Sequence, residues 1–169
     1  TYTAVYNISG NTLFQLADKE IPHLITADEG NAPIALLSTN QPYATEQMWE
    51  GRSRYDIYTV NLQTGERRQI KKASNSNMQL APKGTYAYWY CAQDSSWYTY
   101  SLANGKEYRL TTPATFAAWD EDNDVPDYPS PHGLAGWTAD DRNLLIYDRY
   151  DIWKFDPTAE VAPVNLTVN

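Results

Sequence analysis

The stretches DIYTVNLQTGERRQI at residues 56–70 and SWYTYSLANGKEYRL at residues 96–110 align without a gap when the second is shifted by 40 positions. Each begins with alternating apolar and polar residues, continues through a Thr-Gly or Asn-Gly pair, and ends in a return stretch. Alternation with a period of two predicts a half-buried strand, and Gly and Asn predict a tight turn because they adopt positive φ at low cost. Each stretch is therefore predicted to be a β-hairpin.

A third, weaker copy is DIWKFDPTAEVAPVNL at residues 151–166. A short turn and an apolar strand precede each hairpin, in EGNAPIALLST (29–39), LAPKGTYAYWYCAQD (80–94) and WTADDRNLLIYDRYD (137–151). Strands that are apolar on both faces suit a sheet covered on both sides. An inner strand followed by an outer hairpin, with successive hairpins 40 and 55 residues apart, is typical of the blades of a β-propeller.

The predicted fold is all-β: a partial β-propeller of about three blades of four-stranded antiparallel sheet plus a partial N-terminal blade. Aromatic residues make up 14% of the chain and favour strands, and ten Pro and eight Gly interrupt it often, so we expect little or no helix. The outer hairpin of a preceding blade is predicted in residues 1–24, the blades at 25–72, 80–111 and 134–167, and an acidic inter-blade insertion at 112–133. Propellers usually close with about four to eight blades, so a chain of 169 residues that begins with Thr1 is expected to be a piece of a longer protein.

The charge of the chain excludes some partners. The formal net charge is −8, which argues against nucleic acid or an anionic membrane surface as a partner. No stretch approaches the roughly 20 apolar residues that span a bilayer, so no membrane insertion is expected. The single cysteine, Cys91, cannot form an internal disulfide.

The repeat also resembles a known family. APKGTYAYWY (81–90) together with WYTYSLANGKEYRLT (97–111) resembles the repeat of TolB-like and dipeptidyl peptidase IV N-terminal propellers, in which a Ser-Pro-Asp-Gly-Lys turn leads into an inner strand. Residues 25–43 (ITADEGNAPIALLSTNQPY) and 119–157 (WDEDNDVPDYPSPHGLAGWTADDRNLLIYDRYDIWKFDP) are similar to the propeller of prolyl-oligopeptidase-family serine peptidases of Bacteroides-like organisms. The turns depart from the family pattern, with Ala81 in place of Ser and Lys83 in place of Asp.

That resemblance implies a non-catalytic propeller that gates and orients peptide substrates for a hydrolase domain absent from this chain. It implies two partners, the hydrolase domain of the parent chain and a peptide substrate, and no cofactor. The family also implies a periplasmic or exported location. No catalytic residue is carried over, and the chain holds no Gly-x-Ser-x-Gly nucleophile motif. The alternatives are a TolB-like protein-binding adaptor and a carbohydrate-binding propeller.

The acidic insertion is a candidate metal site. Hard cations such as Ca²⁺ prefer several carboxylate oxygens, and four aspartates alternate through DEDNDVPD: Asp120, Asp122, Asp124 and Asp127. An EF-hand is excluded because Val125 and Pro131 occupy the positions that need Gly and Glu. The two interpretations left open are an irregular calcium loop and a solvated insertion between blades.

A candidate binding surface lies between an inner strand and its hairpin. Trp49, with Met48 and Tyr43, falls in a long predicted loop, and binding residues are often carried by loops. These aromatic side chains could contact a sugar or a peptide, and the alternative is that they pack between blades.

Two further expectations concern surfaces. The basic pairs Arg67-Arg68 and Lys71-Lys72 are interpreted as a solvated edge, where charge also discourages edge-to-edge strand pairing. The open ends of a partial propeller expose apolar faces that tend to be covered by another chain, so we predict self-association of the isolated fragment.

Overall fold

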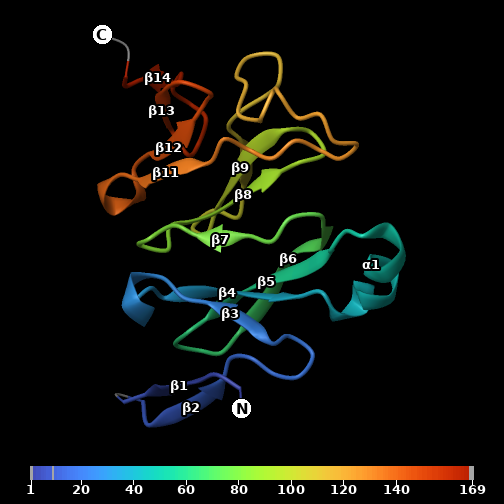
Figure 1. Ribbon diagram of the computed structural model, residues 1–169. Coiled ribbons are helices and arrows are strands. Elements are labelled where there is room, and N and C mark those ends of the chain that lie inside the picture. Colours follow the sequence, from blue (N-terminus) through green and yellow to red (C-terminus); the bar gives the residue numbers. More distant parts are fainter. Residues whose placement is uncertain (1, 9, 168–169) are drawn as a thin grey trace. The chain divides into compact units, whose positions relative to one another are not determined.

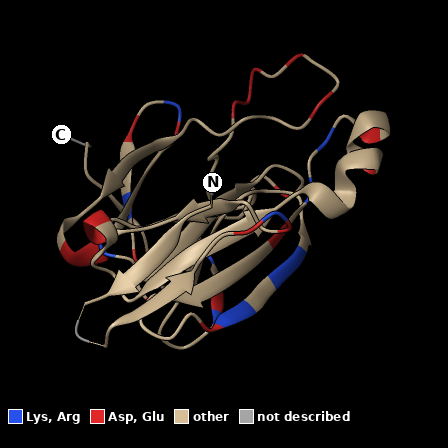
Figure 2. Cartoon of the chain, turned by 90° about the horizontal axis from the view of Figure 1, so that it is seen from below, with Lys and Arg blue, Asp and Glu red and all other residues tan. Residues whose placement is uncertain are grey.

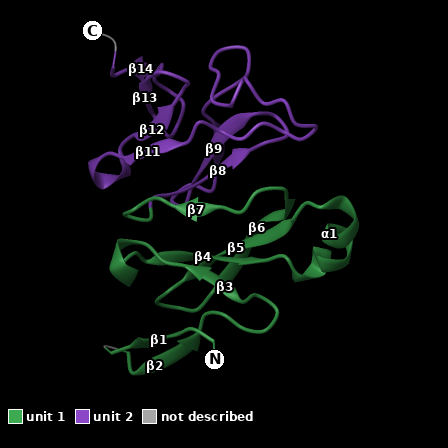
Figure 3. Ribbon diagram, viewed as in Figure 1, with its two compact units in different colours: residues 1–84 green, residues 85–169 purple. Residues whose placement is uncertain are grey.

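The structure is a computed structural model that describes residues 2–8 and 10–167 (Figure 1). The chain divides into two compact units, unit 1 (Thr1–Gly84) and unit 2 (Thr85–Asn169), which are coloured separately in Figure 3. Every strand pairing within each unit is antiparallel, as the all-β prediction requires.

Unit 1 contains a two-stranded hairpin and a four-stranded sheet. The hairpin is β1 (Ala4–Asn7) with β2 (Thr12–Gln15), and the sheet has the order β3-β4-β5-β6. The sheet strands are β3 (His23–Ile25), β4 (Ile34–Thr39), β5 (Tyr55–Asn61) and β6 (Arg67–Ser74), and the short β7 (Gln79–Leu80) follows. The helical segments are the 3-10 turns η1 (Asp28–Gly30) and η2 (Gln41–Tyr43) and the helix α1 (Ala44–Glu50).

In unit 1 the hairpin packs on one face of the sheet. Their shared core consists of Leu16, Ala17, Ala35, Leu37, Val60 and Leu62, with Val5 and Phe14 of the hairpin packed against it. Gly65, in the β5–β6 turn, has φ +72°, and a Cβ there would lie 2.9 Å from the ring of Phe14. This turn therefore needs glycine for both its backbone angle and its close approach to the hairpin. An ion pair of 2.6 Å between Arg67 and Asp18 also joins the sheet to the segment that follows β2.

Unit 2 contains two groups of strands that share a core. Its strands are β8 (Tyr86–Cys91), β9 (Ser96–Ser101), β10 (Glu107–Arg109), β11 (Leu134–Trp137), β12 (Leu144–Tyr147), β13 (Ile152–Phe155) and β14 (Val164–Asn165), with the 3-10 turn η3 (Ala139–Asp141). The last four form a sheet in chain order. The shared core consists of Trp97, Phe116, Ala118, Leu144, Ile146 and Phe155, and the buried Thr99 hydroxyl on β9 donates to the Pro157 carbonyl after β13. Face-to-face packing of successive sheets is what a propeller requires.

The predicted turns and the N-terminal hairpin are confirmed, with two differences elsewhere. Gly65 and Gly105 have φ of +72° and +70°, and β1 pairs with β2 as expected, although Ser9 of that turn lies outside the described residues. The segment around Trp49 is not a loop: it is α1, a helix of seven residues. The return strand of the third hairpin, β14, has only two residues. The blade boundaries themselves stay a prediction.

The helices bear on one further expectation. Within residues 2–8 and 10–167, none of them has the length and apolar character needed to cross a bilayer.

Candidate functional site

The insertion between β4 and β5, residues 40–54, is the strongest candidate for a binding site. It contains η2 and α1, and the helix ends at Gly51, whose N–H donates to the Gln47 carbonyl at 2.9 Å. Gly51 has φ +67°, a left-handed conformation that glycine adopts without a Cβ penalty and that commonly ends helices. The insertion therefore contains a regular helix with a defined end and is not an irregular loop.

Tyr43 anchors the start of this helix to the sheet. Its hydroxyl donates to Asp56 Oδ1 at 2.6 Å, and the same oxygen accepts the backbone N–H of Ala73 at 2.9 Å. Asp56 is buried on β5, and Ala73 lies on β6 with φ +51°. The hydrogen bond to a carboxylate raises the pKa of Tyr43, because it favours the neutral phenol. The predicted binding residue Tyr43 thus has its polar group committed to the fold.

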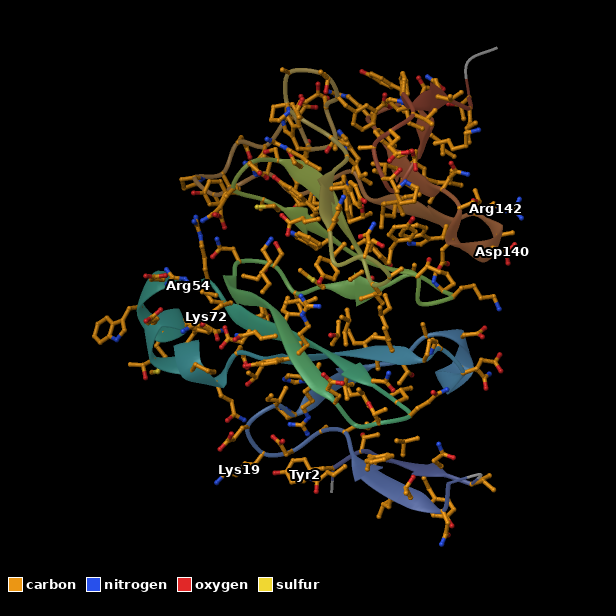
Figure 4. All side chains as sticks on the ribbon, turned by 180° about the vertical axis from the view of Figure 1, so that it is seen from behind. Tyr2, Lys19, Arg54, Lys72, Asp140 and Arg142 are labelled. Atoms are coloured by element: carbon orange, nitrogen blue, oxygen red, sulfur yellow. The ribbon has the colours of Figure 1, made fainter. Side chains whose placement is uncertain are left out.

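Arg54 anchors the other end. Its two guanidinium nitrogens donate to Glu46 at 3.1 Å and to Glu50 at 2.8 Å, and Figure 4 shows Arg54 beside the helix. These side chains are between 35% and 53% exposed, so each pair contributes at most about 1 kcal/mol after solvent screening. Their effect is to hold the orientation of α1 relative to β5.

The anchored helix presents two large apolar side chains to solvent. Met48 is 85% exposed and Trp49 is 87% exposed. A tryptophan carries roughly 200 Å² of mainly apolar surface, and burying it at about 25 cal/mol per Å² contributes up to about 5 kcal/mol before the costs of association. A few residues carry most of the binding energy of a protein interface, and tryptophan is enriched among them.

The acidic insertion of unit 2 is closed at its base. Trp119 and Pro131 form a β-bridge, and Asp120 N–H donates to the Ser130 carbonyl at 2.8 Å. Within the loop, Asp120 Oδ1 accepts the N–H of Asp122 at 3.1 Å, and Asp127 Oδ1 accepts the N–H of Tyr128 at 2.7 Å. The carboxylates are thus used in local turns.

The structure does not bring the four predicted calcium ligands together. Asp122 forms an ion pair of 2.6 Å with Arg149, which lies in the turn between β12 and β13. In the part of the chain that the structure describes, no three His, Cys, Asp or Glu side chains are grouped so as to hold a metal ion. Calcium binding by Asp120, Asp122, Asp124 and Asp127 stays a prediction, and it requires the loop to rearrange around the cation.

Sequence reasoning missed two features of the structure. The first is the ion pairing of Arg54, which the sequence could have indicated, because Glu46, Glu50 and Arg54 are spaced four residues apart. The second feature is a cavity of about 410 Å³ beside β13, lined in part by Lys154, Asp156 and Glu160.

The carboxylate of Asp156 is already saturated in that cavity. It accepts the backbone N–H groups of Thr158, Glu160 and Val161 at 3.0 to 3.1 Å. Burial alone would raise the pKa of Asp156, but these bonds and that of the Thr158 hydroxyl outweigh it and lower the pKa below its usual value. The group therefore serves to order residues 156–161.

Comparison with known proteins supports the fold. No protein-family model and no curated protein sequence matches the chain. Among solved structures it is similar to a putative TolB from Agrobacterium tumefaciens, with a TM-score of 0.50 and 15% identity over 94% of this chain and 52% of that chain. It is also similar to TolB from Acinetobacter baumannii (TM-score 0.49, 13% identity, 98% and 37% covered) and to an oligogalacturonate lyase in complex with manganese (0.41, 16%, 85% and 36%).

The fold class follows from the sheets and from this likeness. The chain is a partial β-propeller with four-stranded antiparallel sheets, and TolB-like propellers are among its structural neighbours. It spans between about a third and about a half of the length of the solved structures it matches. At these identities the likeness shows the fold alone.

Proposed function

We propose that this chain is a non-catalytic β-propeller segment that binds another polypeptide through the α1 insertion, with Trp49 as the anchor. The observation that carries the proposal is the 87% exposure of Trp49 on a helix held at both ends by Tyr43 and Arg54. Preorganised support reduces the entropy lost on binding, so an aromatic side chain held in this way is an efficient contact.

The resemblance of residues 119–157 to prolyl-oligopeptidase-family propellers supplies one identity for that polypeptide. In this form of the proposal the partner is the hydrolase domain of the parent chain, and the propeller gates and orients its peptide substrates. A periplasmic or exported location belongs to the same proposal. An adaptor that binds a separate protein, as the TolB-like fold suggests, is the alternative, and it needs no hydrolase domain.

Site-specific photo-crosslinking in the natural full-length gene product tests the proposal. A benzophenone amino acid replaces Met48, the exposed neighbour of Trp49, and a second version replaces Tyr150, which is 83% exposed in unit 2. We expect an adduct at position 48, mapped by mass spectrometry to the hydrolase domain or to a bound peptide, and its loss when Trp49→Ala is added.

Two results would overturn the proposal. The first is the absence of any polypeptide adduct at position 48, and the second is an equal yield at position 150. Retention of the chain on a glycan array that Trp49→Ala abolishes would replace the polypeptide partner by a carbohydrate, the other role considered for these aromatic residues.

A further inference from the structure

The free edge of β6 is the second unusual surface of unit 1. β6 (Arg67–Ser74) has eight residues and is the last strand in the order β3-β4-β5-β6. In antiparallel pairing, alternate residues direct their N–H and C=O groups toward the partner and the others direct theirs away from it. No strand in the described residues is hydrogen-bonded to the edge of β6 that faces away from β5, so this edge is a template on which a further strand could pair.

This edge carries a concentration of positive charge in an acidic protein. Four of the 13 basic residues lie within six positions of β6: Arg67, Arg68, Lys71 and Lys72. Figure 2 shows this run of basic residues along the strand, and Lys72 is labelled in Figure 4. Arg67 is paired with Asp18. Arg68 and Lys72 are exposed, and neither forms an ion pair with any residue the structure describes.

A bulge in β6 places two of these cations on one face. Arg68 is opposite Thr59 of β5, and Lys71 is opposite Ile57, with a register shift between them. Residues three apart in a regular strand lie on opposite faces, because side chains alternate. Ile70 is the extra residue, so Arg68 and Lys71 share the face of Thr59 and Ile57. Lys72 follows Lys71 directly, so the two exposed cations, Arg68 and Lys72, lie toward opposite faces of the edge.

We propose that this edge binds an extended acidic peptide segment by strand addition, with carboxylates of the incoming strand beside the two exposed cations, Arg68 and Lys72. Backbone hydrogen bonds supply affinity in this mode, and charge supplies selectivity and register. Positive charge on a strand edge opposes pairing with the same edge of a second copy. The same charge favours pairing with a negatively charged strand. A nucleic acid offers negative charge but no peptide N–H and C=O ladder, so an open strand edge together with cations favours a polypeptide.

The test uses the complete 169-residue chain and fluorescence anisotropy. The probe is a labelled peptide of about ten residues in which Asp alternates with Val or Thr, long enough to cover a strand of this length. A second probe carries N-methyl groups on alternate amides, which preserves its charge and removes its backbone donors. We expect saturable binding to the wild type. The binding should be weakened about ten-fold or more by R68E/K72E and by N-methylation of the probe, and it should be weakened by added salt.

The controls separate the edge from charge in general. Lys106→Glu changes one exposed cation in the β9–β10 turn, and Lys19→Glu changes one in unit 1; both should leave the affinity of the acidic peptide within about two-fold. Circular dichroism and thermal melting confirm that each variant is folded.

Four outcomes overturn the proposal: no saturable binding, equal binding of the N-methylated probe, an equal loss in Lys19→Glu, and tighter binding of a DNA duplex of matched charge. A fifth contradicting result is a dimer of the chain without peptide, seen by sedimentation, that R68E/K72E abolishes, because a second copy would then occupy this edge. The proposal does not depend on Trp49, so Trp49→Ala is expected to bind the acidic probe like the wild type.

Discussion

The hydroxyl of Tyr43 donates to Asp56 Oδ1 at 2.6 Å, and so ties the start of the α1 insertion to the centre of the sheet in unit 1. The same carboxylate oxygen accepts the N–H of Ala73 on β6. One buried side chain thus connects the insertion, β5 and the bulged end of β6. The two surfaces proposed above, Trp49 and the β6 edge, are both adjacent to this connection.

We expect Tyr43→Phe to lower the free energy of unfolding by about 1–3 kcal/mol. The substitution keeps the ring and leaves the buried carboxylate of Asp56 with one hydrogen-bond donor fewer. Urea denaturation followed by tryptophan fluorescence measures the change. Tyr2→Phe, at a tyrosine that is 47% exposed, is the matched control and should resemble the wild type. A wild-type midpoint for Tyr43→Phe would show that the anchor is not needed for stability.

In unit 2, the carboxylate of Asp141 is 1% exposed and accepts both the N–H and the hydroxyl of Thr85, at 3.1 and 2.7 Å. Thr85→Val removes only the hydroxyl bond, and we expect a loss of about 1 kcal/mol. Asp141→Ala removes both bonds and should cost about 3 kcal/mol or more. A double-mutant cycle measures the coupling. Strict additivity of the two substitutions would contradict a direct interaction.

The lowered pKa of Asp156 predicts an acid-sensitive contribution to stability. Because the folded-state pKa lies below the unfolded value of 3.8, the ionised form is favoured by folding. The contribution of this carboxylate to the stability of the fold is complete above its unfolded-state pKa. It is lost as the pH falls through its folded-state pKa. We expect the difference in melting temperature between wild type and Asp156→Asn to be present at neutral pH and to shrink below about pH 4. A difference that is independent of pH would contradict this assignment.

The calcium hypothesis for the acidic insertion gives a further test. Arg149 neutralises Asp122 and so competes with any cation for that carboxylate. If the loop binds calcium, Arg149→Ala should bind it more tightly than the wild type, with more heat released in titration calorimetry and a higher melting temperature in millimolar calcium. The absence of heat and of any melting shift in both proteins would end the hypothesis.

Self-association of the isolated chain should involve the outward face of the β1–β2 hairpin. Tyr6 and Leu13 are cross-strand neighbours there and are 55% and 70% exposed. Leu13→Lys introduces a charge in the middle of this apolar face, and we expect it to shift the chain from dimer to monomer in sedimentation equilibrium. A wild-type chain that is monomeric at high micromolar concentration would contradict self-association through this face.

The strand pattern was predictable because it depends on local signals. Alternation marked β5 and β9, and the positive φ of Gly65 and Gly105 is what a Thr-Gly or Asn-Gly pair encodes. Helix α1 was missed because seven residues are too few to show a helical period, and its seven side chains include none that is buried.

The contacts that define the candidate sites could not be predicted in the same way. Asp122 meets Arg149 across 27 positions of sequence, and Asp56 meets Ala73 across 17 through a bulge. Such pairings depend on register and tertiary packing, which a single sequence does not specify locally.

Hydrogen exchange at residues 44–50 tests the central claim, a polypeptide contact at Trp49, most directly. The measurement compares the isolated 169-residue chain with the natural full-length gene product. We predict slower deuterium uptake at α1 in the full-length protein, lost in Trp49→Ala and retained in Tyr150→Ala, because a bound polypeptide excludes water from the helix. Equal uptake in the two wild-type proteins would contradict a contact between Trp49 and the hydrolase domain of the parent chain.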